Sequence, residues 1–217
     1  MGNPNVSSNS TIIRVNSIFY TIQGEGFHSG ARAVFIRLSG CNLACGFCDT
    51  EFKYGEPRTC SWILSEVEMV GGSCKFIVLT GGEPGMQNIG PLVDLLKKND
   101  FYVTIETNGM YELPSSLDWV CVSPKTSIKS DKFVVRKADE YKFVVGLYGK
   151  VPNTSGLSAS HYWLSPKNGS SIGGEIKVGE KSCNRLDSVA AQYCVQMVKE
   201  SSKFKLSLQT HKYLGIK

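Results

Sequence analysis

Residues 33–48 read AVFIRLSGCNLACGFC, an apolar run followed by three closely spaced cysteines. The run at residues 33–39 is nearly continuous and rich in β-branched and aromatic residues, which is typical of a strand buried on both faces of a sheet. Cys41, Cys45 and Cys48 then fall in the loop beyond the carboxyl end of that strand. Because α/β proteins place their reactive groups at this edge, the stretch predicts a parallel sheet that presents three thiols.

The rest of the chain repeats this pattern of apolar strands with fewer helices. Only about a dozen residues separate the strand ending at Thr107 from the next one, and they include Gly109 and Pro114, which leaves little room for a crossover helix. We therefore expect an α/β fold with about six parallel strands and about three helices, an incomplete TIM-like barrel. The expected strands cover residues 12–21, 33–39, 75–80, 102–107, 119–123, 141–145, 161–165 and 205–210, and the expected helices cover 61–70, 88–98 and 184–199.

Composition sets the class of protein. The 217 residues are 41% hydrophobic and 20% charged, which fits one globular domain over residues 12–217 after a polar, disordered leader at 1–11. The leader lacks the apolar segment of a signal peptide, and no run reaches the length of a membrane span, so we expect a cytoplasmic protein without membrane contact. The net charge of +5 comes from scattered Lys and Arg. This pattern argues against direct nucleic-acid binding and suits an anionic substrate or an acidic electron donor.

The spacing of the three cysteines indicates the kind of metal centre. Three thiolates within eight residues can wrap one compact iron–sulfur cluster, and with no fourth cysteine nearby one iron keeps an open position. The alternative is a zinc loop in a nucleic-acid-binding module, completed by Cys60 or His28. Zinc sites of that kind usually show paired Cys-x2-Cys hooks, and only one such pair occurs here.

The triplet resembles the signature of the radical S-adenosylmethionine superfamily, Cys-x3-Cys-x-aromatic-Cys, with Phe47 at the aromatic position. A second motif, Gly81-Gly82-Glu83-Pro84, follows an apolar strand, as in that superfamily. The resemblance implies a [4Fe–4S] cluster on the three cysteines, with S-adenosylmethionine bound to the fourth iron and split into methionine and a 5′-deoxyadenosyl radical. The residues implied in cofactor binding are Phe47, Asp49, Gly81, Gly82, Glu83, Glu106, Ser123 and Lys125.

Both ends of the chain are similar to the 7-carboxy-7-deazaguanine synthase family of queuosine biosynthesis. The similarity rests on residues 22–26 (IQGEG), on Arg37, on Asp49-Thr50 and on residues 208–216 (LQTHKYLGI). It implies the radical ring contraction of 6-carboxy-5,6,7,8-tetrahydropterin to 7-carboxy-7-deazaguanine, with loss of ammonia and a need for Mg²⁺. A glycyl-radical activase, which shares the triplet, is the alternative enzyme, and it lacks these two terminal segments.

The implied site residues suit this substrate chemically. Gln23 and Glu25 can pair with the donors and acceptors of a pterin edge, and the planar fork of Arg37 matches a carboxylate. Mg²⁺ prefers oxygen ligands, which the Thr50 hydroxyl can supply. The resemblance implies a homodimer and a flavodoxin- or ferredoxin-like reductant, and the implied substrate-binding residues are Ile22, Gln23, Gly24, Glu25, Arg37, Thr80 and His211.

Overall fold

The structure is a computed structural model that describes residues 11–48, 50–146, 151–167, 176–178, 181–183 and 188–216. The chain forms two compact units, which are described separately. Unit one comprises Met1–Thr21 and Arg32–Val120, and unit two comprises Ile22–Ala31 and Cys121–Lys217. Residues 1–10 of the predicted leader lie outside the described residues, and Asp49, predicted to bind the cofactor, lies outside them as well. No helix in the described ranges is long and apolar enough to cross a bilayer.

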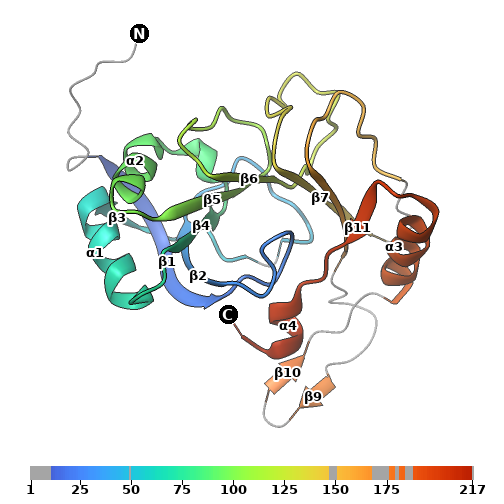
Figure 1. The fold of residues 1–217 in the computed structure, drawn as a ribbon, viewed down its shortest axis with the longest axis horizontal. Coiled ribbons are helices and arrows are strands. Elements are labelled where there is room, and N and C mark those ends of the chain that lie inside the picture. The colour runs from blue at the N-terminus through green and yellow to red at the C-terminus, as the bar shows by residue number, and fades with distance from the viewer. Residues whose placement is uncertain are drawn as a thin grey trace. The chain divides into compact units, whose positions relative to one another are not determined.

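Unit one is a sheet with its helices packed against it (Figure 1). Its strand order is β5-β4-β2-β1-β3, and β2, β4 and β5 run parallel. Helix α1 contacts α2 and β2, while α2 contacts β5. The elements are β1 (Ile12–Ile22), β2 (Arg32–Leu38), β3 (Glu56–Thr59), α1 (Cys60–Gly71), β4 (Phe76–Gly81), the 3-10 turn η1 (Pro84–Met86), α2 (Gly90–Lys98) and β5 (Tyr102–Thr107).

One apolar core holds unit one together. The strands contribute fully buried residues such as Ile36 and Leu79, and α1 and α2 contribute Ile63 and Leu96. Thr59 starts α1 by accepting a hydrogen bond from the Trp62 N–H at 3.2 Å, an N-cap that satisfies one of the free amides of the first turn. This core fixes the carboxyl ends of β2, β4 and β5 relative to one another.

Strand β6 (Trp119–Val122) leads from unit one into unit two. Unit two has the strand order β11-β8-β7-β6 with parallel pairing, and α3 packs on β8 and β11. Its further elements are β7 (Glu140–Val145), β8 (His161–Pro166), the antiparallel pair β9 (Ile176–Val178) and β10 (Lys181–Cys183), α3 (Ser188–Glu200), β11 (Phe204–Leu206) and α4 (Thr210–Leu214).

The parallel α/β class is confirmed, and several predicted boundaries change. The strand predicted at 205–210 is wrong beyond Leu206. The last bond from this segment to β8 joins the Ser207 N–H to the Leu164 carbonyl, and α4 begins at Thr210. The helix predicted from residue 88 begins at Gly90. The third helix is described from Ser188, so the predicted start at 184–187 lies outside the described residues. Strands β3, β9 and β10 and helix α4 were not predicted.

Candidate active site

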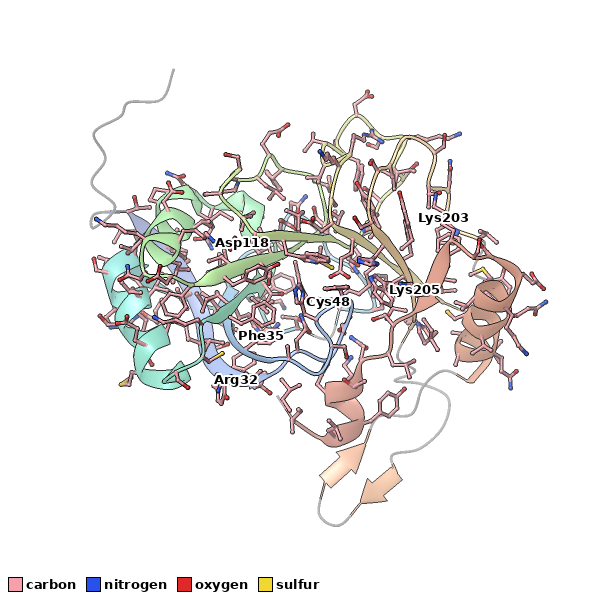
Figure 2. The ribbon with its side chains drawn as sticks, viewed as in Figure 1. Arg32, Phe35, Cys48, Asp118, Lys203 and Lys205 are labelled. Carbon is pink, nitrogen blue, oxygen red and sulfur yellow. The ribbon has the colours of Figure 1, made fainter. Side chains whose placement is uncertain are left out.

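The three predicted cluster ligands lie in the loop that follows β2, where Cys48 is labelled in Figure 2. All three are free thiols, with Cys41 and Cys45 half-buried and Cys48 exposed. A backbone hydrogen bond from the Cys48 N–H to the Cys45 carbonyl, 3.0 Å long, folds the second half of the loop. Phe47 is exposed in this turn. The loop therefore offers accessible sulfur ligands on backbone that is already turned.

The surroundings of the Cys41 thiol oppose its ionisation. Burial raises the pKa of the Cys41 thiol, and nearby Glu83, Cys45 and Cys48 raise it further, against one opposing hydrogen bond from the Leu43 N–H. A bound iron centre would supply the positive charge that stabilises the thiolates.

The geometry of these ligands also bears on zinc. Among the described residues, no three His, Cys, Asp or Glu side chains converge on a point that could hold one metal ion. A zinc site needs four ligands around one point, whereas a cluster takes each cysteine on a different iron. In the described residues the three thiols do not surround one point, and in a cluster each of them would bind a different iron.

The glycine turn after β4 packs directly against the start of the cysteine loop. Gly81 has φ +135°, and a Cβ there would collide with the Leu38 backbone. A Cβ on Gly82 would collide with the Gly40 carbonyl, to which the Glu83 N–H donates at 2.8 Å. Only glycines allow this approach, which brings the backbone of the turn against Gly40 and the start of the cysteine loop.

Glu83 connects this turn to the end of β5. Its side chain is 1% exposed and accepts hydrogen bonds from the Gly85 N–H at 2.9 Å, the Thr107 hydroxyl at 2.7 Å and the Asn108 N–H at 2.6 Å. Burial raises the pKa of this carboxyl, while the three donors oppose the shift. The side-chain amide of Asn108 (Nδ2) in turn donates to Asn42 Oδ1, in the cysteine loop, at 2.8 Å. The buried Glu83 carboxylate thus links the glycine turn to the end of β5, and Asn108 continues this network to the cysteine loop.

A row of polar side chains crosses β2, β4 and β5 at their carboxyl ends. Arg37 and Thr80 are register partners on β2 and β4, and the Thr80 hydroxyl donates to Glu106 Oε2 on β5 at 3.3 Å. Arg37 Nη1 donates to Thr50 Oγ1 at 3.2 Å, and its guanidinium lies 5.6 Å from the centre of the Phe19 ring. Four predicted site residues of unit one are therefore brought together.

Predicted site residues of unit two also form a connected group. Glu25 forms an ion pair with Lys142 at 2.6 Å and accepts a hydrogen bond from the Gln209 amide at 2.8 Å. The buried Gln23 accepts from the Glu25 N–H at 3.2 Å through its side-chain carbonyl. His211 lies against Gly24 so closely that a Cβ on the glycine would collide with its ring. Ile22, the last residue of β1, is 40% exposed.

Two residues predicted to bind the cofactor follow β6. Lys125 Nζ donates to Ser123 Oγ at 2.8 Å, and Ser123 Oγ donates to the Lys142 carbonyl at 2.9 Å. No role was predicted for Lys142 or Glu140, and Gln209 entered only through the similarity of residues 208–216. The one available signal for Glu140 and Lys142 was a pair of opposite charges in the otherwise apolar strand EYKFVV.

Comparison with known proteins decides the family. The profile of the radical SAM superfamily matches residues 35–123. The 7-carboxy-7-deazaguanine synthase of Bacteroides thetaiotaomicron is 38% identical, over 94% of this chain and 98% of that protein. The chain belongs to the 7-carboxy-7-deazaguanine synthase family. The synthase of Rickettsia prowazekii, 37% identical over 97% of this chain and 92% of its own length, agrees with this assignment.

A solved structure from the same family supports the fold. The crystal structure of QueE from Escherichia coli matches with a TM-score of 0.69 and 25% identity, over 96% of this chain and 99% of that one. The match agrees with the predicted incomplete barrel. Membership also settles the cofactors in general terms, because the radical SAM superfamily works with a [4Fe–4S] cluster and S-adenosylmethionine, and the synthase family depends on Mg²⁺. Neither the activase nor the zinc-stabilised nucleic-acid-binding module is favoured.

Proposed function

We propose that this chain catalyses the ring contraction of 6-carboxy-5,6,7,8-tetrahydropterin to 7-carboxy-7-deazaguanine. The observation that carries the proposal is the similarity to synthases over nearly the whole chain, at 38% identity. Substrate and product differ by one molecule of ammonia, so the conversion needs no net oxidant or reductant. This balance suits a hydrogen atom that is removed and later returned.

The residues of unit one would hold the cofactors and the substrate carboxylate. When bound, the cluster and S-adenosylmethionine supply the one-electron chemistry that removes a hydrogen atom from the substrate. Cys41, Cys45 and Cys48 would hold the cluster, and the backbone of the glycine turn would face the methionyl group. Arg37 would bind the carboxylate with its fork of N–H donors, next to Mg²⁺ on Thr50. This clamp would orient C6 without taking part in the redox step.

The residues of unit two would recognise the pterin ring. The Gln23 and Glu25 side chains offer hydrogen-bonding groups of the kind that a pterin edge requires. We propose that His211 also contacts the pterin, and that Ser123 and Lys125 contact S-adenosylmethionine. Both units would then belong to one catalytic domain, as the sequence predicts for residues 12–217.

We propose a flavodoxin- or ferredoxin-like reductant, because the net charge of +5 favours an acidic donor. We also propose a homodimer that works in the cytoplasm, with no nucleic acid or membrane bound directly.

An anaerobic assay tests the proposed function. The cluster is reconstituted with iron and sulfide, and the pterin is supplied with S-adenosylmethionine, reductant, and Mg²⁺ or a chelator. The expected result is 7-carboxy-7-deazaguanine and ammonia in equal amounts, more rapidly with Mg²⁺, and neither product with a Cys45→Ala control. Cleavage of S-adenosylmethionine without any conversion of the pterin would refute the proposal and point to another radical enzyme.

A further inference from the structure

The backbone of the loop 22–31 is held at three points in unit two. The Phe27 N–H donates to Glu140 Oε2 at 2.9 Å, and the Gly26 N–H donates to Ser207 Oγ at 2.9 Å. The Gly24 carbonyl accepts from the Thr210 N–H at 3.0 Å. Both Glu140 and Ser207 are buried. These contacts fix the path of the loop without using the side chain of Glu25.

That side chain has its own partner on β7. The Glu25 side chain is 13% exposed and the Lys142 side chain 7%, and their charged atoms lie 2.6 Å apart. Glu25 Oε2 faces Lys142, while Oε1 accepts from Gln209 at 2.8 Å. Because an ionised carboxylate can accept about four hydrogen bonds, each oxygen has capacity for another donor.

Glu140 and Lys142 come from the same strand, two positions apart. Side chains two residues apart on a strand point to the same face, and both residues are buried. A buried ion pair is weak evidence for stability, since well-packed apolar residues often replace one at no cost. Here one partner of the pair is Glu25, in the loop proposed for the pterin, so the geometry suits a role in the site.

We propose that Lys142 is a positioning residue of the pterin site, which keeps the Glu25 carboxylate ionised and aimed so that it accepts hydrogen bonds from the N–H groups of the pterin. The inference rests on the proposed function and goes one residue beyond it. Lys142 acts through Glu25 and needs no contact with the substrate.

Removing Lys142 should change the charge of Glu25 while the loop stays in place. Burial alone would raise the pKa of the Glu25 carboxyl, but Lys142, with help from Gln209 and His211, lowers it to about 2. Without Lys142 the effect of burial is opposed only by Gln209 and His211, so the pKa of the Glu25 carboxyl should rise and favour its protonated form. The charged groups close to Glu25 are Lys142 and His211, with Glu140 next to Lys142 on β7. The loop backbone keeps its contacts to Glu140, Ser207 and Thr210.

The first test reads the protonation state directly and needs no turnover. Infrared difference spectra between each protein and its Glu25→Gln derivative isolate the Glu25 band at pH 7. The unmutated protein should show a carboxylate band, and Lys142→Met should show the carbonyl band of a protonated acid. Lys142→Arg keeps the positive charge and should restore the carboxylate band. Lys97→Met is the matched control, because it breaks the Lys97–Asp118 ion pair of unit one (Asp118 is labelled in Figure 2).

The second test measures KM for the pterin with the reconstituted holoenzyme between pH 6 and 9. Lys142→Met should raise KM at least about tenfold at pH 7, the loss expected for a hydrogen bond to an ionised group. Its KM should fall as pH rises and Glu25 ionises, relative to the unmutated enzyme. The double variant with Glu25→Gln should lose this pH dependence, which excludes His211 as its source. Lys142→Arg should recover most of the affinity.

The two arms separate the inference from the proposed function. A carboxylate band in Lys142→Met, or a KM for the pterin that matches that of Lys97→Met, would overturn the role of Lys142. If the unmutated holoenzyme does not convert the pterin, the proposed function fails, and the infrared arm still decides whether Lys142 keeps Glu25 ionised.

Discussion

Replacing Glu83 tests whether the glycine turn is held by the buried carboxylate. In Glu83→Ala the Thr107 hydroxyl and the Asn108 N–H, both buried, lose their acceptor, while Gly85 is only half-buried and can turn to water. An unsatisfied buried donor costs about 1–3 kcal/mol, so two of them cost about 2–6 kcal/mol. Relief from burying a carboxylate offsets part of this cost. We expect unfolding free energy to fall by about 3 kcal/mol, a large share of the 5–15 kcal/mol typical of a domain.

The assay is urea unfolding of the cluster-free protein under anaerobic conditions, followed by circular dichroism. Glu112→Ala, at an exposed carboxylate further along the chain, is the control and should change the unfolding free energy by less than about 0.5 kcal/mol. The unfolding free energy of Glu83→Gln should lie between those of Glu83→Ala and Glu112→Ala. The glutamine amide keeps one acceptor oxygen but turns an N–H₂ group toward a donor. If Glu83→Ala is as stable as the control, the three hydrogen bonds do not support the turn and the reasoning is wrong.

Three further predictions concern the reaction. Cys45→Ala should lose cluster assembly and cleavage of S-adenosylmethionine, measured by iron content and methionine release, whereas Cys194→Ala, at a buried thiol in α3, should keep both. Arg37→Ala should slow pterin conversion at least about thirtyfold, from the roughly 2–5 kcal/mol lost with one partner of a buried charge pair, and spare most of the uncoupled cleavage of S-adenosylmethionine. Equal losses would indicate a structural role. Thr50→Val should keep the cluster but blunt the response of turnover to Mg²⁺, and Thr50→Ser should retain it; an unchanged response in Thr50→Val would place the metal elsewhere.

The features that the sequence predicted correctly are those that depend on residues adjacent in the chain. The triplet of cysteines and the Gly-Gly-Glu-Pro turn each occupy a few positions after an apolar strand, so local spacing was enough to find them. The parallel α/β class followed in the same way from apolar runs such as the one that became β4. What local spacing could not give was the contact between Glu83 and the end of β5, which depends on the pairing of two strands.

Other features depend on partners far along the chain. Lys142 shares its strand with the opposite charge of Glu140, and nothing in the local sequence indicates that its ion-pair partner is Glu25. The strand predicted at 205–210 ends at Leu206, and helix α4, which begins at Thr210, was not predicted. The Thr210 N–H that starts this helix bonds the Gly24 carbonyl, a partner far away in the sequence. Strand β3 was missed because it consists of Pro57 and three polar or charged residues. It pairs with β1 at the edge of the sheet, where a proline is tolerated.

The hydrogen bonds that hold the loop 22–31 have a consequence for how the protein assembles. The bonds from Gly26 to Ser207, from Gln209 to Glu25 and from Thr210 to Gly24 join residues 181, 184 and 186 positions apart. Contacts of such long range carry the highest entropic cost and form late in folding. Residues 32–120, by contrast, form most of unit one as a single continuous stretch of chain. The cysteine loop lies within this stretch, so it can reach its folded shape before the C-terminal residues close on the loop 22–31, the segment proposed for pterin recognition.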